Sequence, residues 1–152
     1  MNFKPEITNQ DFLACLAAAE QGDSNAMYLI GYCYFLGQGT RTNRKRAVTW
    51  WSKAAKQGQA EAQYWLGVSY EAGLGVPEDA ATALKWLRQS AESGYESAQT
   101  KIVFHYLFSK RRPISALITR EEAEKYCRLA ASQGNSLAAM WLRRFKQEKS
   151  TP

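Results

Sequence analysis

A repeat of 36 residues constrains the fold of this chain more than any other feature of the sequence. Gly22, Gly58 and Gly94 are 36 residues apart (58 − 22 and 94 − 58), and Gly134 follows after 40 (134 − 94). Small, aliphatic and aromatic residues recur in the same register. They are Ala26, Ala62, Ala98 and Ala138; Ile30, Leu66, Ile102 and Leu142; and Tyr34, Tyr70 and Tyr106. Because one such unit cannot bury its apolar face alone, the repeat predicts units that stack on one another.

Each unit is predicted to contain two helices. In the middle unit, the recurring residues of the first helix are three or four positions apart, which places them on one helical face. They are Ala62, Leu66, Gly67 and Tyr70. Gly73 and Pro77 then end this helix. Polar residues that share a register precede the second helices and are predicted to cap them; they are Asn43, Asp79 and Thr119. Trp50 and Trp86 recur within the second helices and are predicted to lie in the core.

The segment from Ala62 to Asp79 carries the pattern Ala-x3-Leu-Gly-x2-Tyr-x2-Gly-x-Gly-Val-x2-Asp, and Ala-x2-Trp follows it. These residues resemble the Sel-1-like repeat, a relative of the tetratricopeptide repeat. The resemblance implies an all-α fold, a right-handed α/α solenoid of about eight helices in a single domain over residues 1–152. Its predicted parts are an N-terminal half repeat (9–21), repeats at 22–57 and 58–93, a degenerate repeat (94–133) and a C-terminal capping helix (134–149).

The third unit departs from this pattern. Val103 stands where a glycine is expected, and Ser109 and Arg111 replace the two loop glycines. Four residues are also inserted before Thr119, since this unit is 40 residues long rather than 36. We therefore expect a longer loop between its two helices.

The reactive residues are too widely spaced for catalysis. Cys33 and His105 are 72 residues apart (105 − 33), two repeats, which predicts a separation of roughly 20 Å. A Cys–His pair acts only within hydrogen-bond reach. Cys15 and Cys127 also occupy equivalent positions of distant units, so we expect no disulfide. With one histidine and no cysteine pair at metal-ligand spacing, we expect no enzyme activity, no metal and no cofactor.

The sequence contains no run of about 18 apolar residues, so no membrane span is expected. Glu6 precedes any apolar stretch, and the segment from Leu13 to Ala19 lacks the basic flank of a secretory signal. We expect a cytoplasmic protein.

One side of each predicted first helix is too apolar to face solvent alone. A rotation of 100° per residue places Tyr64, Val68 and Glu71 opposite the core positions, in a row that Leu107 continues. The resemblance implies that first helices line the concave side, so this row would form a groove for a partner. The predicted groove residues are Tyr28, Tyr32, Phe35, Tyr64, Trp65, Val68 and Phe104. The alternative is that the curvature of the solenoid or a neighbouring turn buries these rings.

Basic residues cluster in the loops between first and second helices. Residues 41–60 carry a charge of +6, and residues 101–152 carry +7, with eleven bases and four acids. The predicted basic edge consists of Arg41, Arg44, Lys45, Arg46, Lys110, Arg111 and Arg112. Glu78 and Asp79 interrupt it. It is either an ordinary solvated edge or a surface that attracts an acidic partner.

These observations favour a protein–protein interaction module, an adaptor or scaffold that binds a protein or peptide with an acidic segment. The resemblance also implies an alternative role, a bacterial immunity or inhibitor protein that occludes a toxin enzyme. Nucleic-acid binding through the basic edge is a second alternative, which the acids that interrupt the edge disfavour. The apolar residues Met140, Trp141 and Phe145 make dimerisation through the C-terminal end a further hypothesis.

Overall fold

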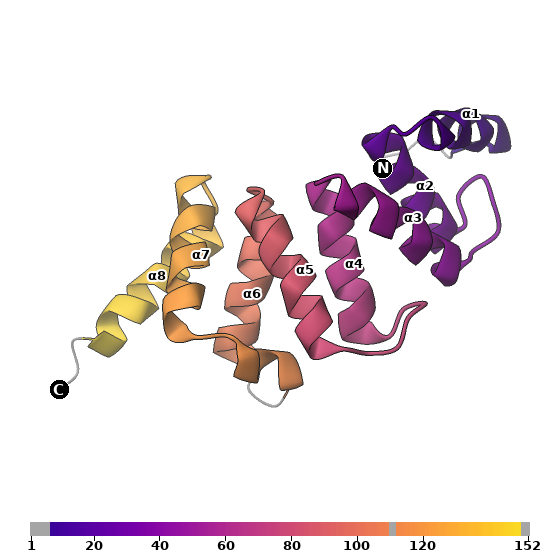
Figure 1. Cartoon of the computed structure of the whole chain (residues 1–152). Coiled ribbons are helices and arrows are strands. Elements are labelled where there is room, and N and C mark those ends of the chain that lie inside the picture. The colour runs from indigo at the N-terminus through magenta and orange to yellow at the C-terminus, as the bar shows by residue number, and fades with distance from the viewer. Residues whose placement is uncertain (1–6, 110–111, 150–152) are drawn as a thin grey trace.

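The computed structural model describes residues 7–109 and 112–149, and within them it contains α-helices, one 3-10 helix and no strand. The helices follow one another in chain order along an extended solenoid, with α1 and α8 at opposite ends (Figure 1). They are α1 (Asn9–Glu20), α2 (Ser24–Leu36), α3 (Arg44–Lys56), α4 (Ala60–Ala72), α5 (Ala80–Glu92), α6 (Glu96–Phe108), η1 (Pro113–Leu117), α7 (Arg120–Ser132) and α8 (Ser136–Lys149). The predicted all-α solenoid of eight helices is confirmed for these residues.

The predicted helix ends are present. Asn43 Oδ1 accepts a hydrogen bond from the Arg46 amide at 3.0 Å and caps α3. Asp79 caps α5 through the amides of its second and third residues. Thr119 accepts from the Glu122 amide at 3.2 Å. Gly73, at φ 64°, ends α4 in the left-handed conformation that side chains disfavour.

The insertion of the third unit forms η1, a 3-10 helix that the sequence had predicted only as a longer loop. Ile114, its second residue, is buried within the core cluster formed by α5 to α8. Proline at its first position fixes the backbone for a helical start. The loop therefore packs onto the solenoid and adds to the core.

The prediction that Trp50 and Trp86 lie in the core was wrong. Both are half-buried and pack against the core from its margin, whereas Trp51 is fully buried. The buried residues of α3 include Val48 and Trp51, so the tryptophan that faces the core is Trp51, which follows Trp50 in the sequence. Lys53 Nζ lies 4.3 Å from the Trp50 ring, which gives this indole a cation to contact at the surface.

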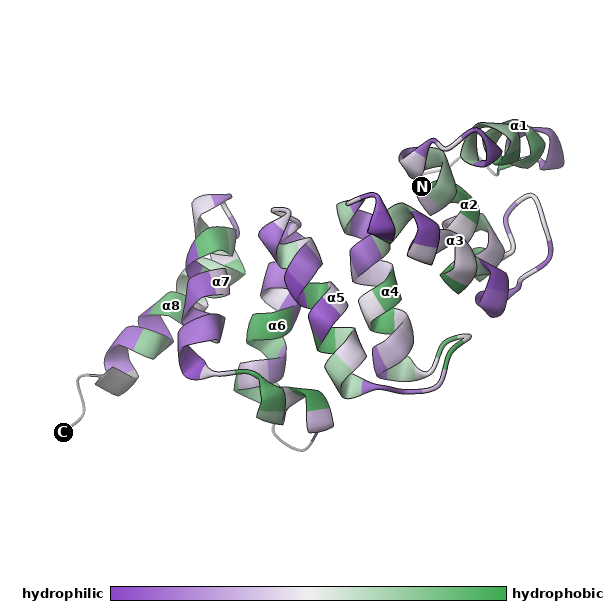
Figure 2. Ribbon diagram, in the orientation of Figure 1, coloured by the Kyte–Doolittle hydropathy of each residue, from purple (hydrophilic) through white to green (hydrophobic). Residues whose placement is uncertain are grey.

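Two glycines allow the paired helices to approach closely. A Cβ atom at Gly67 would lie 2.8 Å from Leu87 Cγ and 3.1 Å from the Ala83 carbonyl oxygen. A Cβ atom at Gly31 would overlap the Trp51 indole. Hydrophobic residues alternate with hydrophilic ones along the helices, and α1 is hydrophobic over most of its length (Figure 2). In the first two units, the first and second helices are thus held by ring or aliphatic packing against a bare backbone.

Gly67→Leu is expected to lower the free energy of unfolding by about 3 kcal/mol, or to prevent folding, because the new side chain overlaps Leu87 and the backbone of α5. Thermal unfolding followed by circular dichroism measures the effect. Ala72→Leu, at an exposed position of the same helix, is the matched control and should shift Tm by only a few degrees. A Gly67→Leu protein that melts like this control would contradict the close helix contact.

Candidate functional site

The predicted groove residues form a partly exposed surface on the first helices. Tyr28, Tyr32 and Phe35 on α2 are half-buried, as are Tyr64, Trp65 and Val68 on α4. On α6, 48% of Phe104 is exposed. We call this set the aromatic face; it consists of Tyr28, Tyr32, Phe35, Tyr64, Trp65, Val68 and Phe104.

Most rings of the aromatic face contact one another. The Tyr32 and Trp65 centroids are 5.7 Å apart, Tyr64 and Trp65 also 5.7 Å, and Tyr28 and Tyr32 6.3 Å. Trp65 is the centre of this cluster and stacks on the buried Trp51 at 5.6 Å, with 21° between the ring planes. Because Trp51 is fixed in the core, the partly exposed rings are held in place before any partner arrives.

Two residues of the predicted row do not face solvent, which corrects that part of the expectation. Leu107 is buried in the core cluster of α5 to α8. Only 9% of the Glu71 side chain is exposed, because residues of α6 and of the segment before η1 pack over it. The rotation rule treats a helix in isolation, and the neighbouring unit and the insertion cover these positions.

Two further exposed apolar residues extend the face: Phe108, which sequence reasoning missed, and Met140, which it named only for dimerisation. The other two residues of that dimerisation hypothesis, Trp141 and Phe145, are buried. Phe108 on α6 is 50% exposed and contacts Phe104 at 5.3 Å. Met140 on α8 is 54% exposed. Met140 follows Thr100 by 40 residues (140 − 100), so the same register would have placed it in line with Tyr28 and Tyr64.

The basic edge is only partly available for binding. Arg41, Arg44 and Lys45 are exposed. Arg46 is exposed as well, but its Nη1 donates a hydrogen bond to the Tyr34 hydroxyl at 3.2 Å and its guanidinium lies over that ring. Lys110 and Arg111 lie outside the described residues.

A charged cluster joins α4 to α6. Glu71 lies 2.9 Å from Lys101 Nζ, 3.2 Å from His105 Nε2 and 3.2 Å from Arg112 Nη1. The His105 side chain is only 4% exposed. Burial raises the pKa of Glu71, but hydrogen bonding and charge from His105 and Lys101 outweigh this and hold that pKa at about 2, below its ordinary value. The cluster is therefore an ion-pair link between two units.

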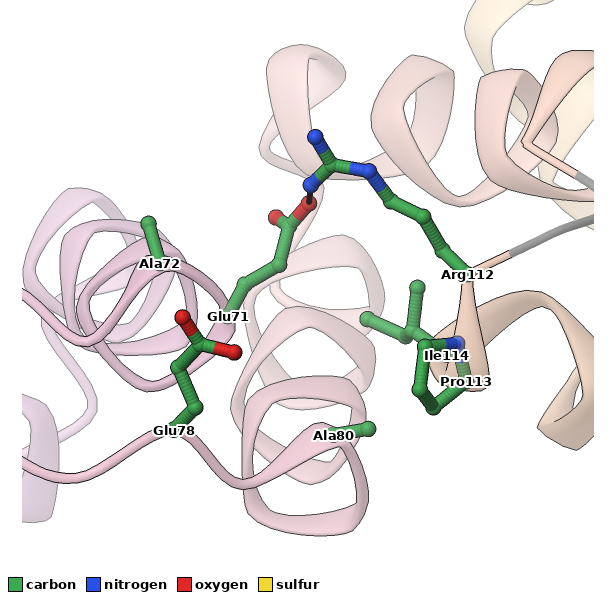
Figure 3. Close-up of a pocket in the computed structure, with 7 residues that line it drawn as sticks. All are labelled: Glu71, Ala72, Glu78, Ala80, Arg112, Pro113 and Ile114. Atoms are coloured by element: carbon green, nitrogen blue, oxygen red, sulfur yellow. Dashed lines mark hydrogen bonds and ion pairs between the residues drawn. The ribbon is translucent and has the colours of Figure 1, made fainter.

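A pocket of about 580 Å³ lies beside this cluster (Figure 3). The Glu71 carboxylate and Arg112 meet on one side of it, and Glu78 lies on the side of α4 and the loop that follows. Its remaining lining is apolar: Ala72, Ala80, Pro113 and Ile114. Pro113 and Ile114 belong to η1, so the inserted segment forms one wall of the pocket.

The cysteines show no sign of activation. Cys33 and Cys127 are buried, Cys15 is half-buried, and all are free thiols. Burial raises the pKa of each, to about 11 for Cys127, which disfavours the reactive thiolate. Cys33 lies in the core cluster of α1 to α4, whereas His105 contacts Glu71. Within residues 7–109 and 112–149, no group of three or more His, Cys, Asp or Glu side chains could hold a metal ion.

The stacked hairpins define an α/α solenoid of the helical-repeat class. The sequence profile of the Sel1 repeat matches residues 24–59, 60–95 and 120–135, and the chain belongs to this family. Proteins of the family generally mediate protein–protein interaction. The profile does not match residues 96–119, where the third unit departs from the pattern.

Two solved structures have the same fold. A Sel1 repeat protein from Oxalobacter formigenes is 33% identical, with a TM-score of 0.79 over 90% of this chain and 53% of that one. A protective antigen present in uropathogenic Escherichia coli strains, which displays an SLR fold, is 23% identical, with a TM-score of 0.78 over 95% of this chain and 30% of that one. This chain thus spans about half of the first protein and less than a third of the second. No curated protein matches it. No helix in the described part of the chain is long and apolar enough to span a bilayer.

Glu71 predicts a specific acid sensitivity. Because its folded-state pKa is about 2 and its ordinary value is 4.5, the ionised carboxylate stabilises the fold above pH 4.5, and this stabilisation is lost as the pH falls toward 2. Between neutral pH and about pH 3, the parent should lose about 2 kcal/mol more stability than Glu71→Gln. Urea titrations measure the difference.

Glu92→Gln is the control for this measurement, because Glu92 is 60% exposed and 3.7 Å from its Lys125 partner. Its stability should follow that of the parent at each pH. Parallel curves for the parent and Glu71→Gln would show that the buried ion pairs do not stabilise the fold.

Proposed function

We propose that this protein is a non-catalytic adaptor that holds a segment of a partner protein against the aromatic face. The observation that carries the proposal is the cluster of half-buried rings anchored on Trp51 through Trp65. Tyrosine, tryptophan and phenylalanine offer large contact areas for little loss of side-chain entropy and dominate the energy of protein interfaces. The rings are already packed, so binding need not order them.

The exposed Phe104, Phe108 and Met140 lengthen the proposed surface toward α8. Phe108 lies 5.9 Å from Trp141, which is itself buried, so this end of the surface is also anchored in the core. Exposed side chains of this size on adjacent units suit an extended or helical partner segment, which contacts one unit after another.

We infer that the partner carries an acidic segment. Arg41, Arg44 and Lys45 are exposed, and no carboxylate of residues 7–109 and 112–149 forms an ion pair with them. Such cations accelerate the association of an oppositely charged partner and contribute less to the final affinity. The partner would be steered by the basic edge and held by the rings.

The same edge argues against nucleic acid as the ligand. Arg46 and Arg112 are engaged with Tyr34 and Glu71, and the acidic Glu78 lies between the two groups of cations. A surface that follows a phosphate backbone needs a continuous run of cations.

The ring surface is tested with Tyr32→Ala combined with Phe104→Ala. Because both side chains are partly exposed, the double variant should retain its fold and lose the partner that the parent captures from native lysate, with affinity reduced at least about tenfold. Leu129→Ala, at a 38% exposed position of α7, is the control and should capture the partner normally. Unchanged capture by a folded double variant would refute the proposed face.

The basic edge is tested with Arg41, Arg44 and Lys45 replaced together by serine. The triple variant leaves Arg46 on Tyr34 and should slow association with the captured partner about tenfold, with a weaker dependence on salt and little change in dissociation. Stopped-flow or surface-based kinetics measure these rates. Binding of single-stranded or duplex nucleic acid by the parent at about 150 mM salt would instead support the nucleic-acid alternative.

A further inference from the structure

Charge is distributed unevenly along the aromatic face. Helix α2 carries no charged residue, and α4 carries only Glu61 and Glu71. Neither helix carries a cation. Lys101 lies on α6, the first helix of the next unit, and it pairs with Glu71. The part of the face on α2 and α4 therefore offers rings and a carboxylate, whereas the basic edge lies outside it.

Glu61 differs from Glu71 in its partners. Its Oε2 accepts a hydrogen bond from Gln59 Nε2 at 2.8 Å. No cation among residues 7–109 and 112–149 forms an ion pair with it. Glu61 is half-buried, so an added cation would be only partly screened by solvent. Of the two carboxylates on α4, Glu71 is paired with cations, whereas Glu61 forms no ion pair with any cation of the described residues.

Three units bring aromatic groups to Glu61. Tyr28 comes from α2, Tyr64 from α4, and Tyr95 precedes α6; the Tyr64 and Tyr95 centroids are 5.3 Å apart. Glu61 precedes Tyr64 by three residues and Trp65 by four on α4, which places these side chains on one side of the helix. Burial raises the pKa of Tyr28, and nearby Tyr95 and Glu61 raise that pKa further. The site thus contains aromatic rings, tyrosine hydroxyl groups and a carboxylate in the first turn of α4.

We propose that this end of the aromatic face binds an arginine side chain of the partner segment. The inference rests on the proposed function and specifies the chemistry that the face recognises. A guanidinium stacks on tyrosine and tryptophan rings through the attraction between a cation and the π face. Its fixed fork of donors also matches the acceptors that the site presents, the Glu61 carboxylate and the tyrosine hydroxyl oxygens.

The proposal has a consequence for the orientation of the partner. Its arginine would lie at Glu61, on the rings of α2 and α4, and its acidic residues would lie toward the basic edge. A segment with both kinds of charge has one orientation on this surface in which each group meets its opposite, and the reversed orientation brings like charges together.

Two blocked pentapeptides test the arginine site directly. One has the sequence Ala-Leu-Arg-Leu-Ala, and the other replaces arginine by citrulline, which has nearly the same shape and no charge. Nuclear magnetic resonance titration of the indole N–H signals, with that of Trp65 assigned through Trp65→Phe, follows binding. The arginine peptide should bind about threefold to tenfold more tightly than the citrulline peptide.

Glu61→Gln should abolish this preference, whereas the matched change Glu92→Gln on the second helix α5 should preserve it. Melting curves verify that both variants are folded. Equal affinity for the two peptides, or binding of neither up to about 10 mM, overturns the arginine site. Capture of the partner by the parent and its loss on changing Tyr32 and Phe104 would still support the proposed function, so the two hypotheses fail separately.

Discussion

The fold depends on the close contact between the two helices of a unit. At Gly31 and Gly67 the first helix has no side chain, and the second helix fills that place with Trp51 or Leu87. Neither position has room for a β-carbon, so the distance between the helices is set by the packing of one side chain, Trp51 or Leu87, against the bare backbone of the first helix. Stacking of successive units follows from this distance, because each pair presents a face of constant shape to the next.

The same contact supports the aromatic face. Trp51 packs on Gly31, Trp65 stacks on Trp51, and the tyrosines contact Trp65. A ring that already packs against the core on one side loses little conformational entropy when a partner contacts its exposed side, and this favours binding. The face is therefore as rigid as the helix pair on which it rests, and its charge pattern, with Glu61 among rings and cations at the edge, is fixed with it.

Much of this structure could be predicted from the spacing of residues. The register located the helices, the caps Asn43, Asp79 and Thr119, and the separation of Cys33 from His105, because each depends on contacts that recur in every unit. The burial of Trp51 in place of Trp50 was not predicted. The position of the buried face shifts by a fraction of a turn along a helix, and the spacing of the repeat does not show which of two adjacent residues faces the core. The formation of η1 could not be predicted, since it arises from the one segment that has no counterpart in the other units. The burial of Glu71 could not be predicted either, because it depends on contacts with Lys101 and His105 of α6 and with Arg112 before η1.

That segment shows how an otherwise regular array becomes specialised. The ends of α6 and α7 are held by their own packing, so the chain between them can be lengthened with little effect on the stacked helices. Here the extra residues fold back, bury Ile114 and enclose the space beside Glu78. A change of sequence within this connection would alter the wall of the pocket beside Glu78, while the helix contacts at Gly31 and Gly67 would stay as they are.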